Sequence, residues 1–259
     1  MISIVIPALN EAENITELLQ HLVENSTASN ITDITVVDGG SIDDTRNLVR
    51  NFISEGYTIT LQPSEKGRAK QMNIGAKNSH GDILYFLHAD SFPPKDFDSL
   101  IISEVKKDNL AGCFRMQFDN NHWWLRLASY LTKFSWRASR GGDQSQFITR
   151  ALFNDIGGFD ETYVIYEDNI LINALYERKQ FVVINKKLRS SARLYEERGI
   201  WNLQYHFWTI YVKRWFGADA NEIYRYYCKH IRRKKLKSLV ETTTETSNVS
   251  QPIEVYSDK

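Results

Sequence analysis

Short apolar runs alternate with amphipathic stretches along the first 118 residues of the chain. These runs predict strands at residues 2–6, 34–37, 57–61, 82–87 and about 111–118, and the β-branched run at 2–6 predicts a buried strand. Apolar positions at helical spacing predict helices after Asn10 and after Ser41, then over residues 67–78 and about 95–107. This alternation predicts an α/β fold with a doubly wound, mostly parallel central sheet and helices on both faces.

The pattern after residue 118 is less regular. It predicts a helix at about 122–137, a strand near 145–149, a helix from about 168 and strands within 181–192. We expect an aromatic stretch over 200–216, a basic helix over 217–239, and a disordered tail over 240–259, which is rich in Ser, Thr and Glu.

Composition narrows the class of protein. Lys and Arg total 32 and Asp and Glu total 32 among 259 residues, so nothing in the overall charge points to nucleic acid as a partner. Cys113 and Cys228 are too few for a disulfide framework or a zinc site. With no signal-peptide pattern and no apolar run of membrane-spanning length, we expect a reduced, cytoplasmic protein.

Two local capping patterns are expected in the first helices. Asn10 is predicted to cap the first helix, with Glu13 as its capping-box partner, and Ser41 to cap the second. Each of these residues also directly follows a predicted strand. In an open α/β sheet, ligands bind beyond the carboxyl ends of the strands, so either role is open for them.

Acidic residues end two of the predicted strands. Asp38 follows the second strand, where a carboxylate is costly unless it meets hydrogen-bond donors such as a nucleobase or a ribose. Gly39 beside it lets the backbone approach a flat ligand. Asp90 follows the fourth strand and is a candidate ligand for Mn²⁺ or Mg²⁺, which take one or two carboxylates together with substrate phosphates. His88 is either a second ligand or a hydrogen-bonded histidine at the sheet edge.

The segment 67–76, GRAKQMNIGA, places two cations at a helix start. Arg68 and Lys70 are positioned there to meet phosphate oxygens, or to form a solvated helix face. The segment does not match a P-loop, because no Gly-Lys-Ser/Thr follows its first glycine.

The ordered set of motifs PALNEAENI, DGGSIDDT, GRAKQMNIGA, FLHADS, GGDQSQF, GGFDE and YEDNIL resembles the family 2 glycosyltransferases of the A-type fold. The resemblance is greatest to a small, single-domain, bacterial-type group with a His-Ala-Asp motif. It implies a catalytic domain over 1–216, with a nucleotide-binding half at about 1–118 and an acceptor half at about 119–216.

The resemblance implies roles for individual residues, in a donor pocket formed by Pro7, Ala8, Asn10, Glu11, Asp38, Gly39, Arg68, Asn73 and Asp90. Asp90 matches the second aspartate of the family's metal motif, and His88 replaces the first, which weakens the expected ribose contact. Gly141-Gly142-Asp143-Gln144 is expected to form a loop over the sugar or acceptor. Arg193 and Arg198 lie where the family keeps basic residues near the diphosphate.

Glu167-Asp168 matches the family's acidic pair on the acceptor side. An acceptor hydroxyl must lose its proton as it attacks the donor sugar, and a nearby carboxylate can accept that proton. We expect Asp168 to be the base and Glu167 to orient the acceptor or its loop. Capping of a helix N-terminus is the alternative for both residues.

The resulting hypothesis is a metal-dependent, inverting transfer of a sugar from a nucleotide diphosphate donor to a hydroxyl acceptor, which is a glycan, a lipid-linked molecule or a small molecule. Two alternatives are a sugar nucleotidyltransferase and a catalytically silent module that binds a nucleotide sugar. The aromatic stretch at 200–216 packs on the core beside the acceptor, or makes a peripheral contact with the inner face of a membrane.

Overall fold

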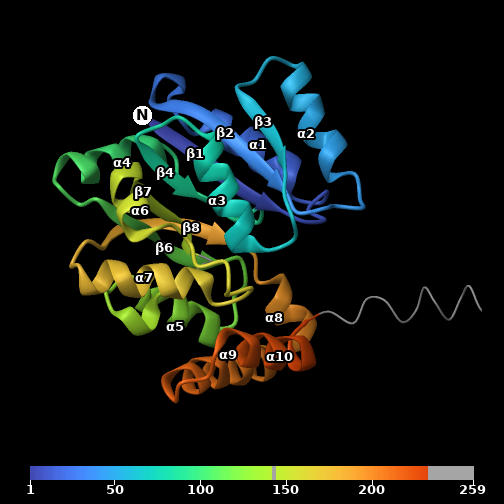
Figure 1. Cartoon of the computed structure of the whole chain (residues 1–259), viewed down its shortest axis with the longest axis vertical. Helices are drawn as coiled ribbons and strands as arrows, with labels where there is room; N and C mark the ends of the chain where they lie inside the picture. Colours follow the sequence, from blue (N-terminus) through green and yellow to red (C-terminus); the bar gives the residue numbers. More distant parts are fainter. Residues whose placement is uncertain (142–143, 233–259) are drawn as a thin grey trace, which may run out of the picture.

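The computed structural model describes residues 1–141 and 144–232 and contains an eight-stranded mixed sheet (Figure 1). The strands follow the order β3-β2-β1-β4-β7-β6-β8-β5, and four of the seven neighbouring pairs are parallel. Their bounds are β1 (Ile2–Ala8), β2 (Ile31–Asp38), β3 (Ile59–Pro63), β4 (Ile83–Phe86), β5 (Ser91–Phe92), β6 (Ala111–Phe118), β7 (Gln146–Thr149) and β8 (Val182–Ser190). The predicted doubly wound, mostly parallel sheet is confirmed.

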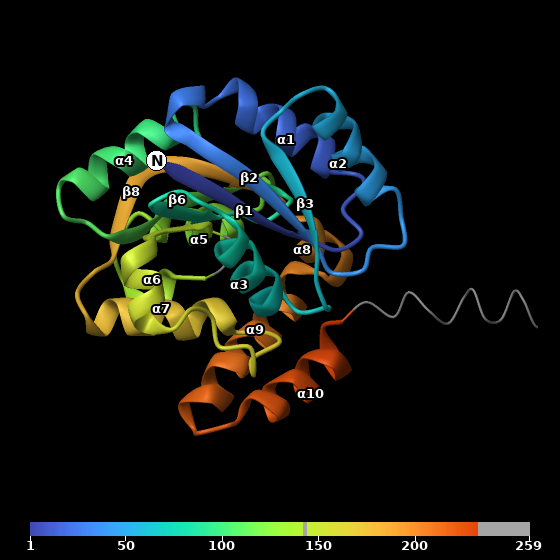
Figure 2. The same cartoon turned by 45° about the horizontal axis from the view of Figure 1, so that its top comes forward.

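Helices lie on both faces of the sheet (Figures 1 and 2). Their bounds are α1 (Ile15–Glu24), α2 (Thr45–Ser54), α3 (Arg68–Asn78), α4 (Phe97–Lys106), α5 (Trp123–Leu131), α6 (Arg150–Ile156), α7 (Glu167–Glu177), α8 (Arg193–Arg198), α9 (Ile200–Trp215) and α10 (Ala220–His230), with 3₁₀ turns at Ala28–Asn30 and Arg137–Ser139. Helices α1, α2 and α4 share one hydrophobic cluster with the sheet, while α3, α6 and α7 share a second.

Strand β1 shows how the sequence divides these two cores. Ile4 and Ile6 belong to the cluster with α1, whereas Val5 between them belongs to the cluster with α3. Successive side chains of a strand point to opposite faces, so a continuous apolar run fills both cores at once. Pro7 fits this central strand because the pairing with β4 ends at Val5, before a backbone N–H at position 7 is needed.

Both predicted helix caps are wrong. Helix α1 begins at Ile15 after Asn14, and α2 begins at Thr45 after Asp44. Asn10 has a left-handed backbone (φ 56°), and its side-chain oxygen accepts from the Ile42 N–H at 2.9 Å. The Ser41 hydroxyl accepts from the Asn10 N–H at 2.9 Å. These side chains join two loops to each other, so they are not available to cap helices.

The helix expected at 122–137 is also too long, since α5 ends at Leu131. Helices α9 and α10 form an additional layer below α5 and α7 and pack around Leu203, Ile210 and Ile223 (Figure 2). Helix α10 ends at His230, and the tail expected at 240–259 lies outside the described residues. Within residues 1–141 and 144–232, no helix is long and apolar enough to cross a membrane.

Candidate active site

The loops that follow β1 and β2 are held together side by side. Besides the bonds of Asn10 with the Ser41 hydroxyl and the Ile42 N–H, the Glu11 N–H donates to Thr45 Oγ1 at 2.9 Å and the Ala12 N–H donates to Asp43 at 3.2 Å. Because β1 and β2 are parallel neighbours, both loops lie at the same carboxyl edge of the sheet. The structure therefore brings together the predicted residues Pro7, Ala8, Asn10, Glu11, Asp38 and Gly39.

Asp38 is buried at the end of β2, and protein groups surround its carboxylate. It accepts from the Gly40 N–H at 3.2 Å and from the Ser41 N–H at 3.1 Å, and Arg46 Nε lies 3.6 Å away. The donors that the sequence analysis sought from a ligand come in the structure from the protein's own loop. Contact with a nucleobase remains a prediction for Asp38.

Gln71 is a residue of this edge that the sequence analysis missed. Its buried side-chain amide donates to the Ala8 carbonyl and to the Val37 carbonyl, both at 2.8 Å, and so joins the ends of β1 and β2. A Cβ at Gly39 would lie 3.0 Å from the Gln71 side chain. The glycine thus makes room for Gln71, a reason that only the three-dimensional packing reveals.

His88, Ala89 and Asp90 form a turn directly after β4. The Ser91 N–H donates to the His88 carbonyl at 3.1 Å, and the Ser191 N–H donates to the Asp90 carbonyl at 3.3 Å, which ties the turn to the end of β8. Burial, together with the nearby charge of Arg68, lowers the pKa of His88 to about 3. The imidazole is therefore neutral at physiological pH and keeps a lone pair.

Acidic groups gather around this turn. Burial, and then the charges of Asp90 and Asp43, raise the pKa of Glu11, while its hydrogen bond from Asn14 and the Arg193 guanidinium 3.8 Å away oppose the rise. No group of three or more potential ligand side chains occurs in the described part of the chain. A divalent ion that takes most of its ligands from water and substrate phosphates needs fewer, so Asp90 and the neutral His88 fit such an ion.

Arg68, in the GRAKQMNIGA segment, lies against the acidic pair Glu167-Asp168. The guanidinium of Arg68, at the start of α3, lies 3.3 Å from Glu167 Oε1 and 3.8 Å from Asp168 Oδ2 at the start of α7. Figure 1 shows the neighbouring ends of these two helices. Since Arg68 also acts electrostatically on His88, it connects the metal-motif turn to the acidic pair. The sequence placed these residues in separate halves.

The environment of Asp168 favours its protonated form. Burial and the adjacent Glu167 carboxylate raise the pKa of Asp168 to about 7, although Arg68 lowers it. Both acids are buried in the first turn of α7, after Tyr166 with its left-handed backbone (φ 74°). A carboxylate with a pKa near neutrality is suited to general-base catalysis, because it can hold and release a proton at physiological pH.

The profile described as "Glycosyl transferase family 2" matches residues 3–181. The chain belongs to this family. The probable glycosyltransferase YdaM of Bacillus subtilis is 23% identical over 276 residues, covering 93% of this chain and 60% of that protein. Glycosyltransferase AglE of Haloferax volcanii is 33% identical over 94 residues, covering 36% of this chain and 31% of AglE. The chain thus spans less than two thirds of the length of both relatives.

Solved structures share the family 2 fold. The mannosyltransferase PcManGT of Pyrobaculum calidifontis, solved with GDP-Man and Mn²⁺, has a TM-score of 0.63 at 16% identity and covers 97% of this chain and 76% of its own. S. aureus TarS 1–349 in complex with UDP has a TM-score of 0.61 at 18% identity, covering 74% of this chain and 60% of its own. At these identities the likeness establishes the fold.

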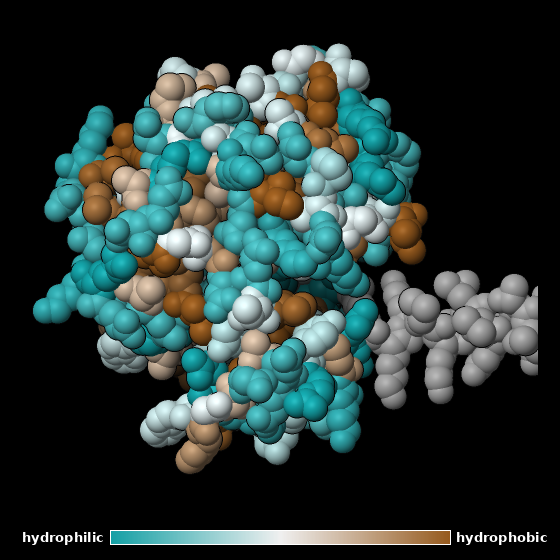
Figure 3. Space-filling view, in the orientation of Figure 1, coloured by the Kyte–Doolittle hydropathy of each residue, from teal (hydrophilic) through white to brown (hydrophobic). Residues whose placement is uncertain are grey.

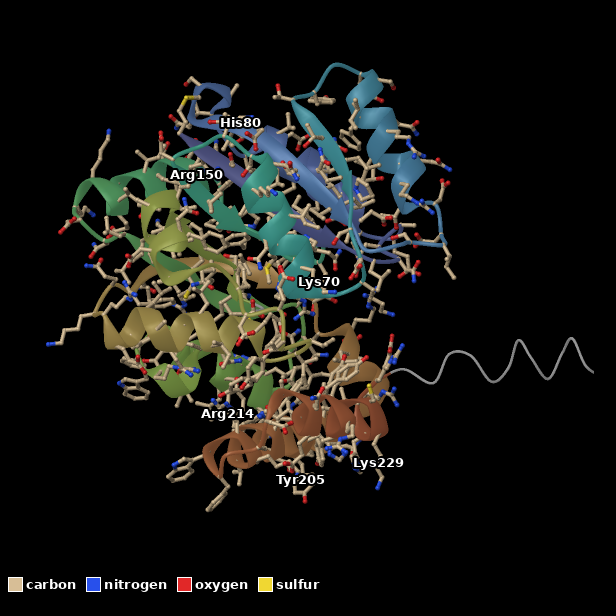
Figure 4. All side chains as sticks on the ribbon, viewed as in Figure 1. Lys70, His80, Arg150, Tyr205, Arg214 and Lys229 are labelled. Atoms are coloured by element: carbon tan, nitrogen blue, oxygen red, sulfur yellow. The ribbon has the colours of Figure 1, made fainter. Side chains whose placement is uncertain are left out.

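Asn73 of this family 2 chain holds a loop in the described structure. Its amide donates to the Phe159 carbonyl and to Glu161, both at 2.9 Å, and its oxygen accepts from the Phe159 N–H at 3.0 Å. The predicted contact with the donor therefore remains untested. A pocket of about 460 Å³ lies nearby, lined by Asn73, Ala76, Lys77, Arg150, Phe153, Asn154, Gly157 and Gly158. Arg150, labelled in Figure 4, is the first residue of α6 and donates to the Gly81 carbonyl before β4, at the edge of the sheet opposite to the carboxyl ends of β1 and β2.

A buried arginine organises the segment before β7, and the sequence analysis also missed it. Arg140 donates to the Thr132 and Phe134 carbonyls, both at 2.7 Å, and to Gln144 Oε1 at 2.6 Å. Gly142 and Asp143 lie outside the described residues, so the expected loop over the sugar is described only at its ends, Gly141 and Gln144. Of the two basic residues expected near the diphosphate, Arg193 lies at the candidate site, whereas Arg198 donates to the Arg232 carbonyl.

Proposed function

We propose that this family 2 chain is a glycosyltransferase that moves a hexosyl group from a nucleotide diphosphate sugar to a hydroxyl acceptor. One observation carries the proposal: Arg68 lies within 3.8 Å of Asp168 and acts electrostatically on His88. In this arrangement a base with a raised pKa would lie beside a turn that fits a metal-bound diphosphate, which supports the proposal. The sugar then lies between the two, with Asp168 on the acceptor side.

Asp168 accepts the proton of the attacking hydroxyl in this proposal. Attack from the side opposite the leaving nucleotide gives inversion at the anomeric carbon. Arg68 has two roles in this proposal. Its guanidinium lowers the pKa of Asp168, and it can donate hydrogen bonds to the phosphate oxygens of the nucleotide sugar. Glu167, fully buried next to Asp168, raises the proton affinity of the base and orients it.

Asp90 and His88 would hold Mn²⁺ or Mg²⁺ together with the donor diphosphate. When bound, the ion supplies Lewis-acid stabilisation of the charge that develops on the leaving nucleotide. PcManGT was solved with GDP-Man and Mn²⁺ and TarS with UDP, which supports a nucleotide-sugar donor and a divalent ion here. We further propose that the transfer takes place on the cytoplasmic side of a cell. Membership of family 2 argues against the nucleotidyltransferase alternative.

The first experiment is thermal denaturation with a panel of UDP- and GDP-linked sugars, with and without Mn²⁺. A ligand that binds only the native state raises its stability by about 2.7 kcal/mol at a hundredfold excess over Kd. We expect one donor to raise Tm in a metal-dependent manner, and Asp90→Ala to abolish the shift. If every donor leaves Tm unchanged in a folded protein, the donor-binding part of the proposal is wrong.

The second experiment separates a transferase from a silent binding module. Asp168→Asn keeps the size of the side chain and removes its basicity. We expect this variant to retain the Tm shift of the donor identified above and to lose turnover by at least ~10²-fold, the lower end of general-base contributions. Wild-type turnover in Asp168→Asn would remove Asp168 as the base, and donor binding without turnover by the parent protein would favour the silent module.

A further inference from the structure

Helix α9 carries an exposed aromatic stripe that no part of the described chain covers. Trp201, Tyr205, Trp208, Val212 and Trp215 recur at intervals of four, three, four and three residues, so they lie on one side of the helix. Their exposed fractions run from 48% at Trp208 to 85% at Trp215. Figure 4 shows Tyr205 pointing away from the body of the molecule, on the side of α9 remote from Arg214.

Helix α5 extends this stripe into a wider surface. Trp123, Leu127 and Tyr130 are spaced by four and three residues, and all three are exposed. The two helices meet through their indoles: the rings of Trp123 and Trp201 are 5.6 Å apart, and those of Trp124 and Trp208 are 5.7 Å apart. We call the exposed sides of α5 and α9 together the aromatic face.

Exposed large hydrophobic side chains are concentrated in the two segments that contain this face. Among the described residues, eleven of the seventeen exposed large hydrophobic side chains lie in residues 123–136 and 201–216. In the view of Figure 3, strongly hydrophobic residues are scattered among hydrophilic ones. Isolated exposed apolar residues are ordinary on a protein surface, whereas a contiguous group of this kind marks an interaction site.

The charge on these segments shows what kind of partner fits. Residues 120–141 and 199–218 contain no Asp or Glu, although the whole chain has 32. Arg126 is exposed on the same side of α5 as Trp123 and Tyr130, and Lys133 Nζ lies 5.7 Å from the centre of the Tyr130 ring. Trp and Tyr with flanking Lys and Arg are the combination that settles at the boundary between lipid headgroups and acyl chains.

A second copy of the chain fits this surface less well. In a symmetric dimer the same face would meet itself, so Arg126 and Lys133 of both copies would lie at an interface to which neither α5 nor α9 brings an acidic residue. Anionic headgroups supply the complementary charge instead. We propose that the aromatic face is a docking surface for an anionic lipid bilayer, which the protein contacts from one side without crossing it.

The docking surface lies next to the candidate active site. The ring of Tyr211, on α9, is 5.4 Å from the ring of Tyr166, the residue before Glu167, and its hydroxyl lies 3.5 Å from Asn169 Oδ1. A bilayer on the aromatic face would therefore lie beside the helix that carries the acidic pair. The docking proposal rests on the exposed residues and their charge and does not require the proposed transfer reaction.

The test is flotation of the full chain with vesicles of phosphatidylcholine alone and of phosphatidylcholine mixed with phosphatidylglycerol. We expect binding to the mixed vesicles, with a blue shift of tryptophan fluorescence, and weaker binding at high salt because the Debye length shrinks to about 3 Å at 1 M. Equal binding to both vesicle types, or binding to neither, would overturn the proposal.

Three variants locate the surface. Trp215→Ala with Phe216→Ala removes two side chains that are 85% and 84% exposed, so the fold has little to lose, and we expect a drop of roughly tenfold or more in partitioning. Arg126→Gln should lower partitioning about fivefold, because one basic residue near an anionic surface contributes ~1 kcal/mol. Tyr57→Ala, which removes an exposed aromatic residue beyond α2, should leave it unchanged.

Sedimentation of the parent and of the Trp215→Ala/Phe216→Ala variant tests whether a second copy of the chain binds the aromatic face instead of lipid. A monomeric parent supports lipid docking. A parent dimer that the double substitution dissociates would show that the aromatic face is a subunit interface, and the proposal would then be wrong.

Discussion

Replacing Arg68 should shift the pH dependence of the proposed sugar transfer. Burial and the Glu167 carboxylate raise the pKa of Asp168, and Arg68 lowers it. The three effects together leave this pKa at about 7. In Arg68→Gln this opposition is lost, and the pKa of Asp168 should rise. The proposed base must be deprotonated to act, so the acid limb of the pH–rate profile should move to higher pH.

The size of the shift follows from the geometry. Two unit charges 3.8 Å apart interact by ~1 kcal/mol at the dielectric constant of water. This screened value is the lower limit, because the Arg68 side chain is 47% exposed whereas that of Asp168 is only 11% exposed. Since one pKa unit corresponds to about 1.4 kcal/mol, the acid limb should move upward by at least ~0.8 pH unit.

The assay is release of nucleoside diphosphate from the donor that raises Tm, measured over about pH 5 to 10 so that both limbs are visible. Arg68 also belongs to the proposed donor site, so a change in the height of the profile is uninformative and the position of the acid limb is the readout. Arg68→Lys keeps the charge and should leave the limb near its original pH. Lys70→Gln, which removes a neighbouring cation that pairs with Glu65, should not move it (Figure 4). An unmoved limb in Arg68→Gln would refute the reasoning.

Three further predictions concern stability. The pKa of Asp168 is higher in the folded state than in the unfolded state, so the unfolded state loses this proton first as pH rises above about 4. The native state is therefore progressively destabilised up to about pH 7. Thermal melts of Asp168→Asn should show a raised Tm at pH ~8 and little change at pH ~4. Gln71→Leu leaves two buried carbonyls without their donor and should cost ~1–3 kcal/mol in urea unfolding, a value that wild-type stability would contradict. In Gly75→Ala the new Cβ would lie 2.3 Å from Val5 Cγ1, so overpacking should cost ~1–3 kcal/mol, whereas Ala at the open position of Gly141 should cost far less.

The sheet was predictable because its apolar runs have no alternative location. Continuous β-branched runs such as residues 2–6 are stable only when both faces are covered, and that requirement specifies parallel strands with helices on each side. The caps were not predictable, because Asn10 and Ser41 can each bond locally or across to the other loop. The choice depends on the pairing of β1 with β2. The paired residues Ile2 and Ile31 are 29 positions apart in the chain, so the pairing leaves no local pattern in the sequence.

The site also depends on contacts between residues that are far apart in the sequence. Family resemblance named Arg68 and Asp168 one by one, and their proximity depends on helix α3, which contacts different parts of the protein at different positions along its length. Arg68 meets the acidic pair and Gln71 joins the ends of β1 and β2. Gly75 allows α3 to pack closely against β1, where a Cβ would collide with Val5.

A helix with these three contacts connects the ends of β1 and β2 to the acidic pair at the start of α7. Movement of α3 by a fraction of an ångström would displace Arg68 from Asp168 and Gln71 from the strand ends at the same time, since a helix moves as a rigid unit. Substitutions at Gln71 or Gly75 should therefore raise the KM for the donor and lower kcat together, although neither residue is assigned to the chemistry. A change confined to one of the two constants would mean that the two halves of the site are positioned independently.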